Sequence, residues 1–360
     1  MIPRNLKSDY MNFAKMAAPA PFNLATSGVA DCTLADLDIS LADLALHGPN
    51  AYGYAPLAEK IATRFGVEAA EVVVAGGGCS FANHLAMAAL LSPGDEVLIE
   101  DPTYELLTAT LTYFQADVRT FPRPPAGRYG LDVGAVVERL TPRTRLVVLT
   151  NLHNPSGALE SEATIHAIAE AAAKVGARVL VDEIYLELMF EGGAARTAFR
   201  PEGGVIVTSS LTKAYGLSGL RCGWILAPAD LAQRMRRLND LFGVLPPHIS
   251  ECLSVVAFDR LPALRARAST MIGANRAAYL EILGRHPGLE QTLLDQGTTV
   301  FPRLAKGDGD QLLARSRAEF DTSFAPGRFF GRPEHIRIGL AGDPVMTRSA
   351  LERLGEALAL

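Results

Sequence analysis

Short apolar runs alternate with amphipathic segments through the middle of the chain. Six runs rich in Val, Ile and Leu predict strands at residues 71–75, 95–101, 145–151, 177–183, 204–210 and 223–227. Runs with so few polar positions are typical of strands that helices cover on both faces in a mostly parallel sheet. The segments between them predict helices at residues 79–91, 104–114 and 161–176. The pattern therefore predicts an α/β fold with such a sheet flanked by helices.

The pattern changes after about Leu231, where helices become longer and more charged. A turn and a short strand are predicted near residues 324–342. A chain of this length is expected to divide into two domains. We predict a large cofactor-binding domain at residues 45–260 and a smaller α+β domain that combines residues 1–44 with residues 261–360.

Composition and charge exclude several classes of function. The 360 residues include 34 Lys and Arg against 39 Asp and Glu, a net charge of −5 without a basic block, so no nucleic-acid or membrane-surface partner is expected. No apolar run approaches the roughly 20 residues that span a bilayer. The four cysteines, Cys32, Cys79, Cys222 and Cys252, lack metal-site spacing and are expected to be buried thiols in a reducing compartment. No metal site is predicted, and we expect a cytoplasmic enzyme.

A glycine-rich segment follows the first predicted strand. "VVVAGGGCSFANHLA" leads from a strand through three glycines into a helix, an arrangement that binds anions through free backbone N–H groups and the helix dipole. A dinucleotide site would need glycine where the spacing from Gly76 and Gly78 places Phe81. This departure argues against a dehydrogenase, although the glycines by themselves are also compatible with a plain tight turn.

Three further polar residues lie at the ends of predicted strands. Asn154, in "HNPSG", either belongs to a simple turn or offers its side-chain amide at the edge of the sheet. Asp182 follows a buried run and needs a cationic or hydrogen-bonding partner, unless it only caps the next helix. Tyr185 lies three residues further on. His153 is expected to be structural.

Lys213 lies between two predicted buried strands, in "SSLTKAYGLSGLRCGW". A desolvated lysine forms imines with aldehydes, whereas the more common alternative is a solvated lysine on a loop. Arg221 suits a dianion such as a phosphate. Pyridoxal 5′-phosphate combines the groups that these residues would bind: an aldehyde for Lys213, a phosphate, a basic ring nitrogen for Asp182 and a phenolic oxygen for Asn154. Lys213 would hold this cofactor as a Schiff base.

These motifs resemble those of the fold-type I pyridoxal-phosphate enzymes, in the aspartate aminotransferase superfamily of class I and II aminotransferases. "HNPSG" resembles the Asn-Pro-x-Gly of that family, "VDEIY" its Asp-x-x-Tyr, and the segment around Lys213 its lysine motif with a following Gly-Leu-Arg-x-Gly. The order and separations also match, from about Tyr52 to Gly339. The resemblance implies a seven-stranded sheet and a pyridoxal-phosphate-dependent aminotransferase acting on an α-amino acid and a 2-oxo acid.

The resemblance also implies roles for individual residues. Lys213 would hold the cofactor and move protons, Asp182 would pair with the ring nitrogen, Asn154 and Tyr185 would bind the ring oxygen, and Tyr104 would stack on the ring. The cofactor phosphate would be held by Gly77, Gly78 and Cys79 through their backbone amides, together with Ser210 and Arg221. Arg337, in "HIRIGL", would bind the substrate carboxylate as a bidentate pair, next to Asn154.

The resemblance leaves some points open. It implies a homodimer with a shared site, but Gly48 stands where the family has the tyrosine that reaches the neighbouring phosphate, so Tyr52 or Tyr54 is the candidate substitute. No arginine is assigned to a substrate side-chain carboxylate. A C–S lyase, a decarboxylase, a cyclopropane-forming synthase and a histidinol-phosphate-type aminotransferase use the same kind of site. A cofactor-binding regulator would need a DNA-binding module, for which this chain has no room.

Overall fold

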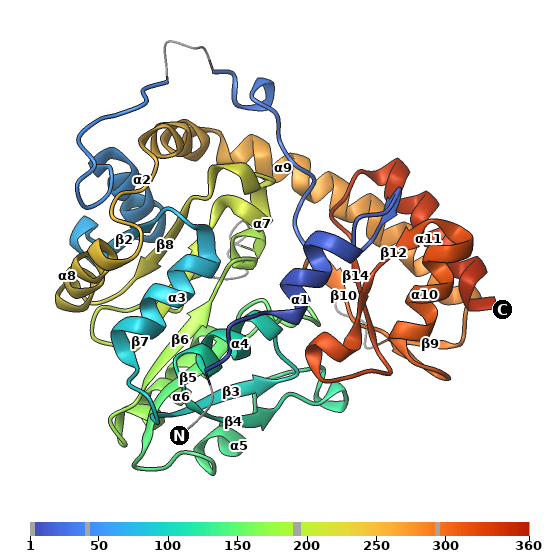
Figure 1. The fold of residues 1–360 in the computed structure, drawn as a ribbon, viewed down its shortest axis with the longest axis horizontal. Coiled ribbons are helices and arrows are strands. Elements are labelled where there is room, and N and C mark those ends of the chain that lie inside the picture. The colour runs from blue at the N-terminus through green and yellow to red at the C-terminus, as the bar shows by residue number, and fades with distance from the viewer. Residues whose placement is uncertain (1–3, 40–43, 190–195, 292–295, 360) are drawn as a thin grey trace.

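A seven-stranded sheet forms the centre of the larger part of the molecule (Figure 1). The computed structural model describes residues 4–39, 44–189, 196–291 and 296–359. The strands lie in the order β2 (Val72–Ala75), β8 (Gly223–Leu226), β7 (Val205–Ser210), β6 (Arg178–Asp182), β5 (Thr144–Thr150), β3 (Glu96–Asp101) and β4 (Asp117–Pro122). Only β8 runs antiparallel to its neighbours. The predicted fold class is confirmed.

The six apolar runs all form strands, with ends that differ by at most one residue from the prediction. The seventh strand, β4, was not predicted from the pattern. It lies at the edge of the sheet, where only Phe121 of its first five residues is buried, so it carries no continuous apolar run. The predicted helices correspond to α3 (Gly78–Leu90), α4 (Glu105–Tyr113) and α6 (Glu162–Ala173).

Helices cover both faces of the sheet, which explains why its strands are apolar at successive positions. Val72 and Val74 face a core formed with α2 (Ala55–Phe65), α5 (Val133–Val137) and α6. Val73 and Ala75 face a second core formed with α3, α4 and α8 (Ala229–Leu238). Because side chains alternate between the two faces of a strand, two covered faces require apolar residues at every position.

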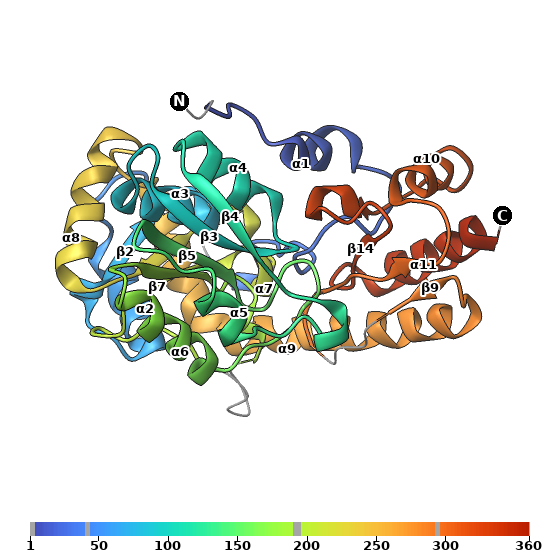
Figure 2. The same cartoon turned by 90° about the horizontal axis from the view of Figure 1, so that it is seen from below.

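The smaller part of the molecule packs around a three-stranded antiparallel sheet of β10 (Thr299–Val300), β14 (Ile336–Gly339) and β13 (Ala325–Pro326). Two further pairs join β1 (Phe22–Asn23) to β12 (Thr322–Ser323) and β9 (Leu289–Glu290) to β11 (Arg303–Leu304). Helices α10 (Gly309–Phe320) and α11 (Pro344–Ala359) lie beside them (Figure 2). The N-terminal helix α1 (Asp9–Asn12) and the helical turn at Phe13–Ala17 contribute Tyr10 and Phe13 to this core.

One long helix, α9 (His248–Arg285), connects the two parts (Figure 1). Its Ala257 and Phe258 lie in a core of the large sheet, whereas Ala278 and Tyr279 lie in the core of the smaller part. A continuous helix therefore crosses the predicted boundary at residue 260. Leu37, which lies within residues 1–44, packs in the same large-sheet core as Ala257.

The four cysteines are free thiols, and Cys79 and Cys222 are buried as expected, but Cys32 and Cys252 are partly exposed. Within the described ranges, no helix combines the length and the apolar character that crossing a bilayer requires.

Candidate active site

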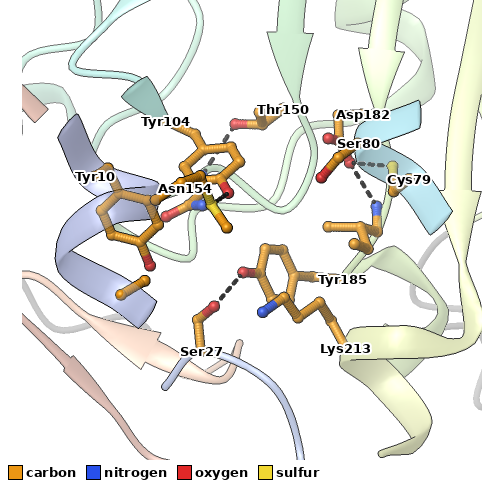
Figure 3. A pocket seen from close by; sticks show the side chains of 13 residues that line it. Tyr10, Ser27, Cys79, Ser80, Tyr104, Thr150, Asn154, Asp182, Tyr185 and Lys213 are labelled. Atoms are coloured by element: carbon orange, nitrogen blue, oxygen red, sulfur yellow. Dashed lines mark hydrogen bonds between the residues drawn. The ribbon is translucent and has the colours of Figure 1, made fainter. Parts of the chain in front are cut away.

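A pocket lies where the parallel strands end. Strands β5, β6 and β7 run in the same direction, so Thr150, Asp182 and Ser210 end them at the same edge of the sheet. The pocket is lined by Thr150, Asn154, Asp182, Ile184 and Tyr185 from these strand ends, Cys79 and Ser80 from α3, Tyr104, Lys213 from α7 (Leu211–Tyr215), and Tyr10, Met11, Ala14 and Ser27 from the N-terminal segment (Figure 3). Six predicted cofactor residues, Lys213, Asp182, Asn154, Tyr185, Tyr104 and Cys79, thus share one pocket.

Asp182 is a buried carboxylate with several donors around it. The amide nitrogen of Asn83 lies 2.7 Å from one carboxylate oxygen, and the Cys79 thiol and the Ile184 backbone N–H lie 3.3 and 3.1 Å from the other. Burial raises the pKa of Asp182, and the donors, Asn83 first, oppose this rise. Asp182 therefore does more than cap a helix, because its carboxylate lines the pocket.

Lys213 is a partly buried lysine rather than a solvated loop lysine. Loss of hydration, followed by the nearby positive charges of Arg337 and Arg221, lowers its pKa to about 8 against the opposing effect of Asp182. The N-terminal segment packs against its stem, since a Cβ at Gly28 would lie 3.1 Å from Lys213 Cδ. A lysine with this pKa is substantially neutral near pH 8 and is therefore a competent nucleophile.

Arg337 lies in β14, fully buried behind the pocket. Its guanidinium donates to Asn154 Oδ1 at 3.1 Å, to the Tyr10 hydroxyl at 2.6 Å and to the Ala25 carbonyl at 3.0 Å. No carboxylate of the described residues forms an ion pair with Arg337, so the alternative of a structural salt bridge does not hold. Its Nε has no hydrogen-bond partner. A buried guanidinium without a counter-ion, one contact away from a pocket, is suited to an incoming anion.

Two tyrosines complete the walls of the pocket. Tyr185 donates to the Ser27 hydroxyl at 2.9 Å, and burial raises its pKa. Tyr104 begins α4, and its hydroxyl lies 3.4 Å from the Met11 sulfur. Tyr10 packs edge-on against Tyr104, with ring centroids 5.3 Å apart. Both predicted tyrosines therefore face the pocket together with the N-terminal segment.

The predicted phosphate site lies at the N-terminus of α3. Gly78 approaches Arg221 so closely that a Cβ there would lie 2.9 Å from Arg221 Nη2, and this nitrogen donates to the Gly77 carbonyl at 2.6 Å. The Gly78 amide donates to the Arg221 carbonyl at 2.8 Å. The Gly78 N–H group thus joins α3 to the Arg221 loop in this structure, and its role toward the phosphate stays a prediction.

The amides of Cys79 and Ser80 follow Gly78 in the first turn of α3, where a helix has no internal acceptors for its N–H groups. Both residues line the pocket, and Ser80 is an addition to the predicted set. Ser210 caps α7, accepting from the Thr212 N–H at 3.3 Å, and its partner in the sheet is Gly223. A Cβ at Gly223 would lie 2.4 Å from the Gly78 carbonyl carbon, so Ser210 and Arg221 are held beside the start of α3.

Sequence reasoning missed several functional residues. Tyr10, Ser27 and Asn83 lie in segments without a strand-end motif, and only the fold brings them to the site. Thr150 ends β5 and was inside a predicted strand, so its position was a usable signal. Its hydroxyl accepts from the Asn154 N–H at 3.0 Å. His153 contacts the Ser156 hydroxyl and the Pro102 carbonyl and is structural, as expected.

The family model of aminotransferase class I and II matches residues 31–354. The chain belongs to this family. An arginine–pyruvate transaminase of Pseudomonas aeruginosa is 32% identical over 315 residues, which are 83% of this chain and 78% of that protein. A capreomycidine synthase of Streptomyces vinaceus is 30% identical over 272 residues, 75% of this chain and 70% of that protein. The solved structure of N-succinyldiaminopimelate aminotransferase from Mycobacterium tuberculosis superposes with a TM-score of 0.87 at 24% identity, covering 98% of each chain.

The predicted enzyme class and cofactor are confirmed: the protein is a pyridoxal-phosphate-dependent aminotransferase. The residues of the pocket fit the cofactor, because the pocket holds the Lys213 amine with its lowered pKa, the buried Asp182 carboxylate and helix amides next to Arg221. When bound, pyridoxal phosphate acts as an electron sink for the substrate carbon. Lys213 can accept and return a proton at its amine, and Asp182 can keep a proton on a basic ring nitrogen. In the described part of the chain no cluster of side chains suits a metal ion.

The position of the missing family tyrosine has a structural explanation. A Cβ at Gly48 would lie 2.1 Å from the His248 imidazole, so a side chain there would require His248 to move. Tyr54 begins α2 and packs edge-on against the same imidazole, with ring centroids 4.8 Å apart. Tyr52 is 51% exposed, and its hydroxyl makes only a long contact of 3.5 Å with Asp240. Tyr52 is therefore the more available of the two candidates.

Proposed function

We propose that this aminotransferase transfers an amino group between an α-amino acid with an uncharged side chain and a 2-oxo acid. The observation that carries the proposal is the buried Arg337, which forms no ion pair with a carboxylate of the described residues and contacts two pocket residues, Asn154 and Tyr10. Both substrates of such a reaction carry one carboxylate next to the reacting carbon. A guanidinium binds this group through two parallel hydrogen bonds, which also fixes the orientation of the substrate.

The lining of the pocket supports an uncharged side chain. Lys213 and Asp182 are its only Lys, Arg, Asp or Glu residues among those described, and both serve the cofactor. The remaining wall is formed by residues such as Met11, Ala14 and Ile184, which offer no ion-pair partner. A charged substrate side chain would lose its hydration in this pocket without compensation. Neither a second carboxylate nor a guanidinium on the substrate fits this wall.

A panel of amino acids tests the proposal with the purified holoenzyme. Amino acids with apolar or neutral side chains are expected to convert the cofactor to pyridoxamine 5′-phosphate, and the matching 2-oxo acids should restore it. Aspartate and arginine serve as the charged comparison and should react far more slowly. Release of ammonia and a 2-oxo acid without an acceptor would instead identify a lyase. A product formed without ammonia release and without conversion of the cofactor would point to a synthase, the class named for the Streptomyces relative.

We also infer that the enzyme works as a homodimer. The segment that precedes α9 exposes Leu241, Phe242, Val244 and Leu245, which are 78%, 46%, 62% and 48% exposed. It continues into Pro246, which touches Gly76 directly before the phosphate site. A second copy covering this patch would bury the apolar side chains and enclose the exposed side of Arg221. Tyr52, on the same side of β2 as Val244, is our candidate for the residue that reaches the partner's phosphate site.

Sedimentation equilibrium of the holoenzyme tests this inference. The protein is expected to sediment as a dimer, and the double substitution Leu241→Asp and Val244→Asp should give monomers that lose the cofactor on dilution. As a matched control, Val345→Asp changes an apolar residue of 78% exposure in α11, far from this patch, and should leave the dimer intact. A fully active monomer would refute the inference.

A further inference from the structure

Asn83, in the second turn of α3, makes the shortest contact to Asp182. The residue is buried, its Nδ2 lies 2.7 Å from Asp182 Oδ2, and its Oδ1 lies 2.6 Å from the Thr208 hydroxyl. Thr208 is itself fully buried in β7, where it pairs directly with Asp182 of β6. The three side chains are therefore linked in a buried series of hydrogen bonds, from Thr208 of β7 to Asn83 of α3 and from Asn83 to Asp182.

The chemistry of the three groups fixes the direction of this series. An ionised carboxylate only accepts hydrogen bonds, so the NH₂ end of Asn83 has to face Asp182. The carbonyl end then faces Thr208, whose hydroxyl is free to act as the donor. Thr208 thus decides which end of the Asn83 amide points at the carboxylate, because the reverse orientation would bring two acceptors together at Asp182.

The position of Asn83 also links Asp182 to the phosphate site. Cys79 and Asn83 are four residues apart, so they lie on the same face of α3, and both donate to Asp182. The amides of the first turn of this helix are the phosphate donors described above. Helix α3 therefore contributes to the predicted phosphate site at its N-terminus. Through Asn83 it also positions the Asp182 carboxylate, which is predicted to pair with the ring nitrogen.

We propose that Asn83, oriented by Thr208, is a positioning residue that holds Asp182 as an ionised acceptor for the ring nitrogen of the cofactor. A carboxylate buried this completely is costly to ionise unless donors compensate for its lost hydration. Asn83 is the largest of the compensating contributions to the pKa of Asp182. This role of Asn83 depends on the bound cofactor, but it is the same whether the enzyme acts as a transaminase or as a lyase. It can therefore fail or succeed independently of the proposed function.

The other titratable groups around Asp182 do not interfere with a pH experiment. Cys79 of α3, Tyr104 and Tyr185 have a raised pKa, and Lys213 of α7 has a pKa of about 8. Of these groups, Asp182 is the one whose charge changes as the pH rises from about 4, the ordinary pKa of an aspartate. Burial raises the folded-state pKa of Asp182. Ionisation of this carboxyl group therefore lowers the free energy of unfolding progressively as the pH rises above about 4.

The first test uses Thr208→Val, which keeps the shape of the side chain but removes the donor, and Thr208→Ser, which keeps the hydroxyl. In the holoenzyme, Thr208→Val and Asn83→Leu are expected to lower kcat about tenfold or more with little change in KM, since hydrogen bonds to charged groups are the stronger ones. Thr208→Ser should recover most of this loss. In an Asp182→Asn background, Asn83→Leu should cause no further loss, because Asn83 acts through Asp182.

The second test needs no activity and no cofactor. The unfolding free energy of Thr208→Val relative to the unmodified protein should fall as the pH rises above about 4, and this pH-dependent part should vanish in the Asp182→Asn background. Equal losses for Thr208→Val and Thr208→Ser would overturn the proposal, as would an Asn83→Leu effect that persists without the Asp182 carboxylate. Either result would mean that these side chains only fill space.

Discussion

Replacement of Arg337 by leucine is the most direct test of how this enzyme binds its substrates. In the structure the guanidinium has three polar contacts, to Asn154, Tyr10 and the Ala25 carbonyl, and no ion pair among the described residues. The charge is therefore balanced only when an anion enters. Truncating one partner of a buried charge pair costs about 2–5 kcal/mol, so kcat/KM for each carboxylate substrate should fall about 30- to 5,000-fold.

The assay compares substrates that do and do not carry the carboxylate. Steady-state kinetics of Arg337→Leu should show the loss for every amino acid and every 2-oxo acid, whereas an amine with the same side chain but no carboxylate should react as before. Cofactor affinity, measured by equilibrium dialysis, should stay almost unchanged because the phosphate site lies at Arg221 and α3. Unchanged KM for all carboxylate substrates, or release of the cofactor, would refute the role of Arg337.

Tyr10→Phe provides the matched control. The ring keeps its edge-on contacts with Tyr104 and Phe329, at centroid distances of 5.3 and 5.5 Å, and only the hydroxyl that holds Arg337 is removed. A substrate carboxylate has to displace this hydroxyl, so the variant should lower KM for carboxylate substrates, the opposite of the Arg337→Leu result. A rise in KM would show that Tyr10 itself binds the substrate.

Three further predictions concern Lys213 and Asp182. Lys213→Ala should fold and bind the cofactor noncovalently but lose turnover, and the visible absorbance of the covalently held cofactor should disappear; activity with that absorbance would place the covalent link at another lysine. Asp182→Asn should keep the covalent link and lose kcat by on the order of 10², comparable to the loss of other preorganised electrostatic groups; a loss of only a few-fold would leave Asp182 a structural role. In the cofactor-free protein, the native state has a neutral Lys213 between its pKa of about 8 and the ordinary 10.5, where the unfolded chain still binds the proton. The unfolding free energy relative to Lys213→Met should therefore rise by about 3 kcal/mol across this range, and a flat difference in urea titrations would contradict the lowered pKa.

The alternation of covered strands and helices could be predicted from local patterns. Strands such as β2 and β6 are apolar at successive positions because helices cover both their faces, and this property can be read along the chain. The edge strand β4 could not be predicted in this way, because Phe121 is the only buried residue among its six. The predicted boundary at residue 260 lies inside helix α9, because the sequence of one continuous helix does not indicate which of its turns pack in which core.

The sequence by itself determined which residues end the parallel strands, and Asp182, Asn154 and Lys213 meet in one pocket for that reason. It did not determine what surrounds them. Arg337 contacts Tyr10 across 327 positions, Tyr185 contacts Ser27 across 158, and Asp182 contacts Asn83 across 99. Such pairs leave no local pattern, since each residue satisfies its hydrogen bonds only after the N-terminal segment, α3 and the smaller part have packed against the sheet. The polar partners that set the charge and orientation of the catalytic groups are therefore a property of the tertiary structure alone.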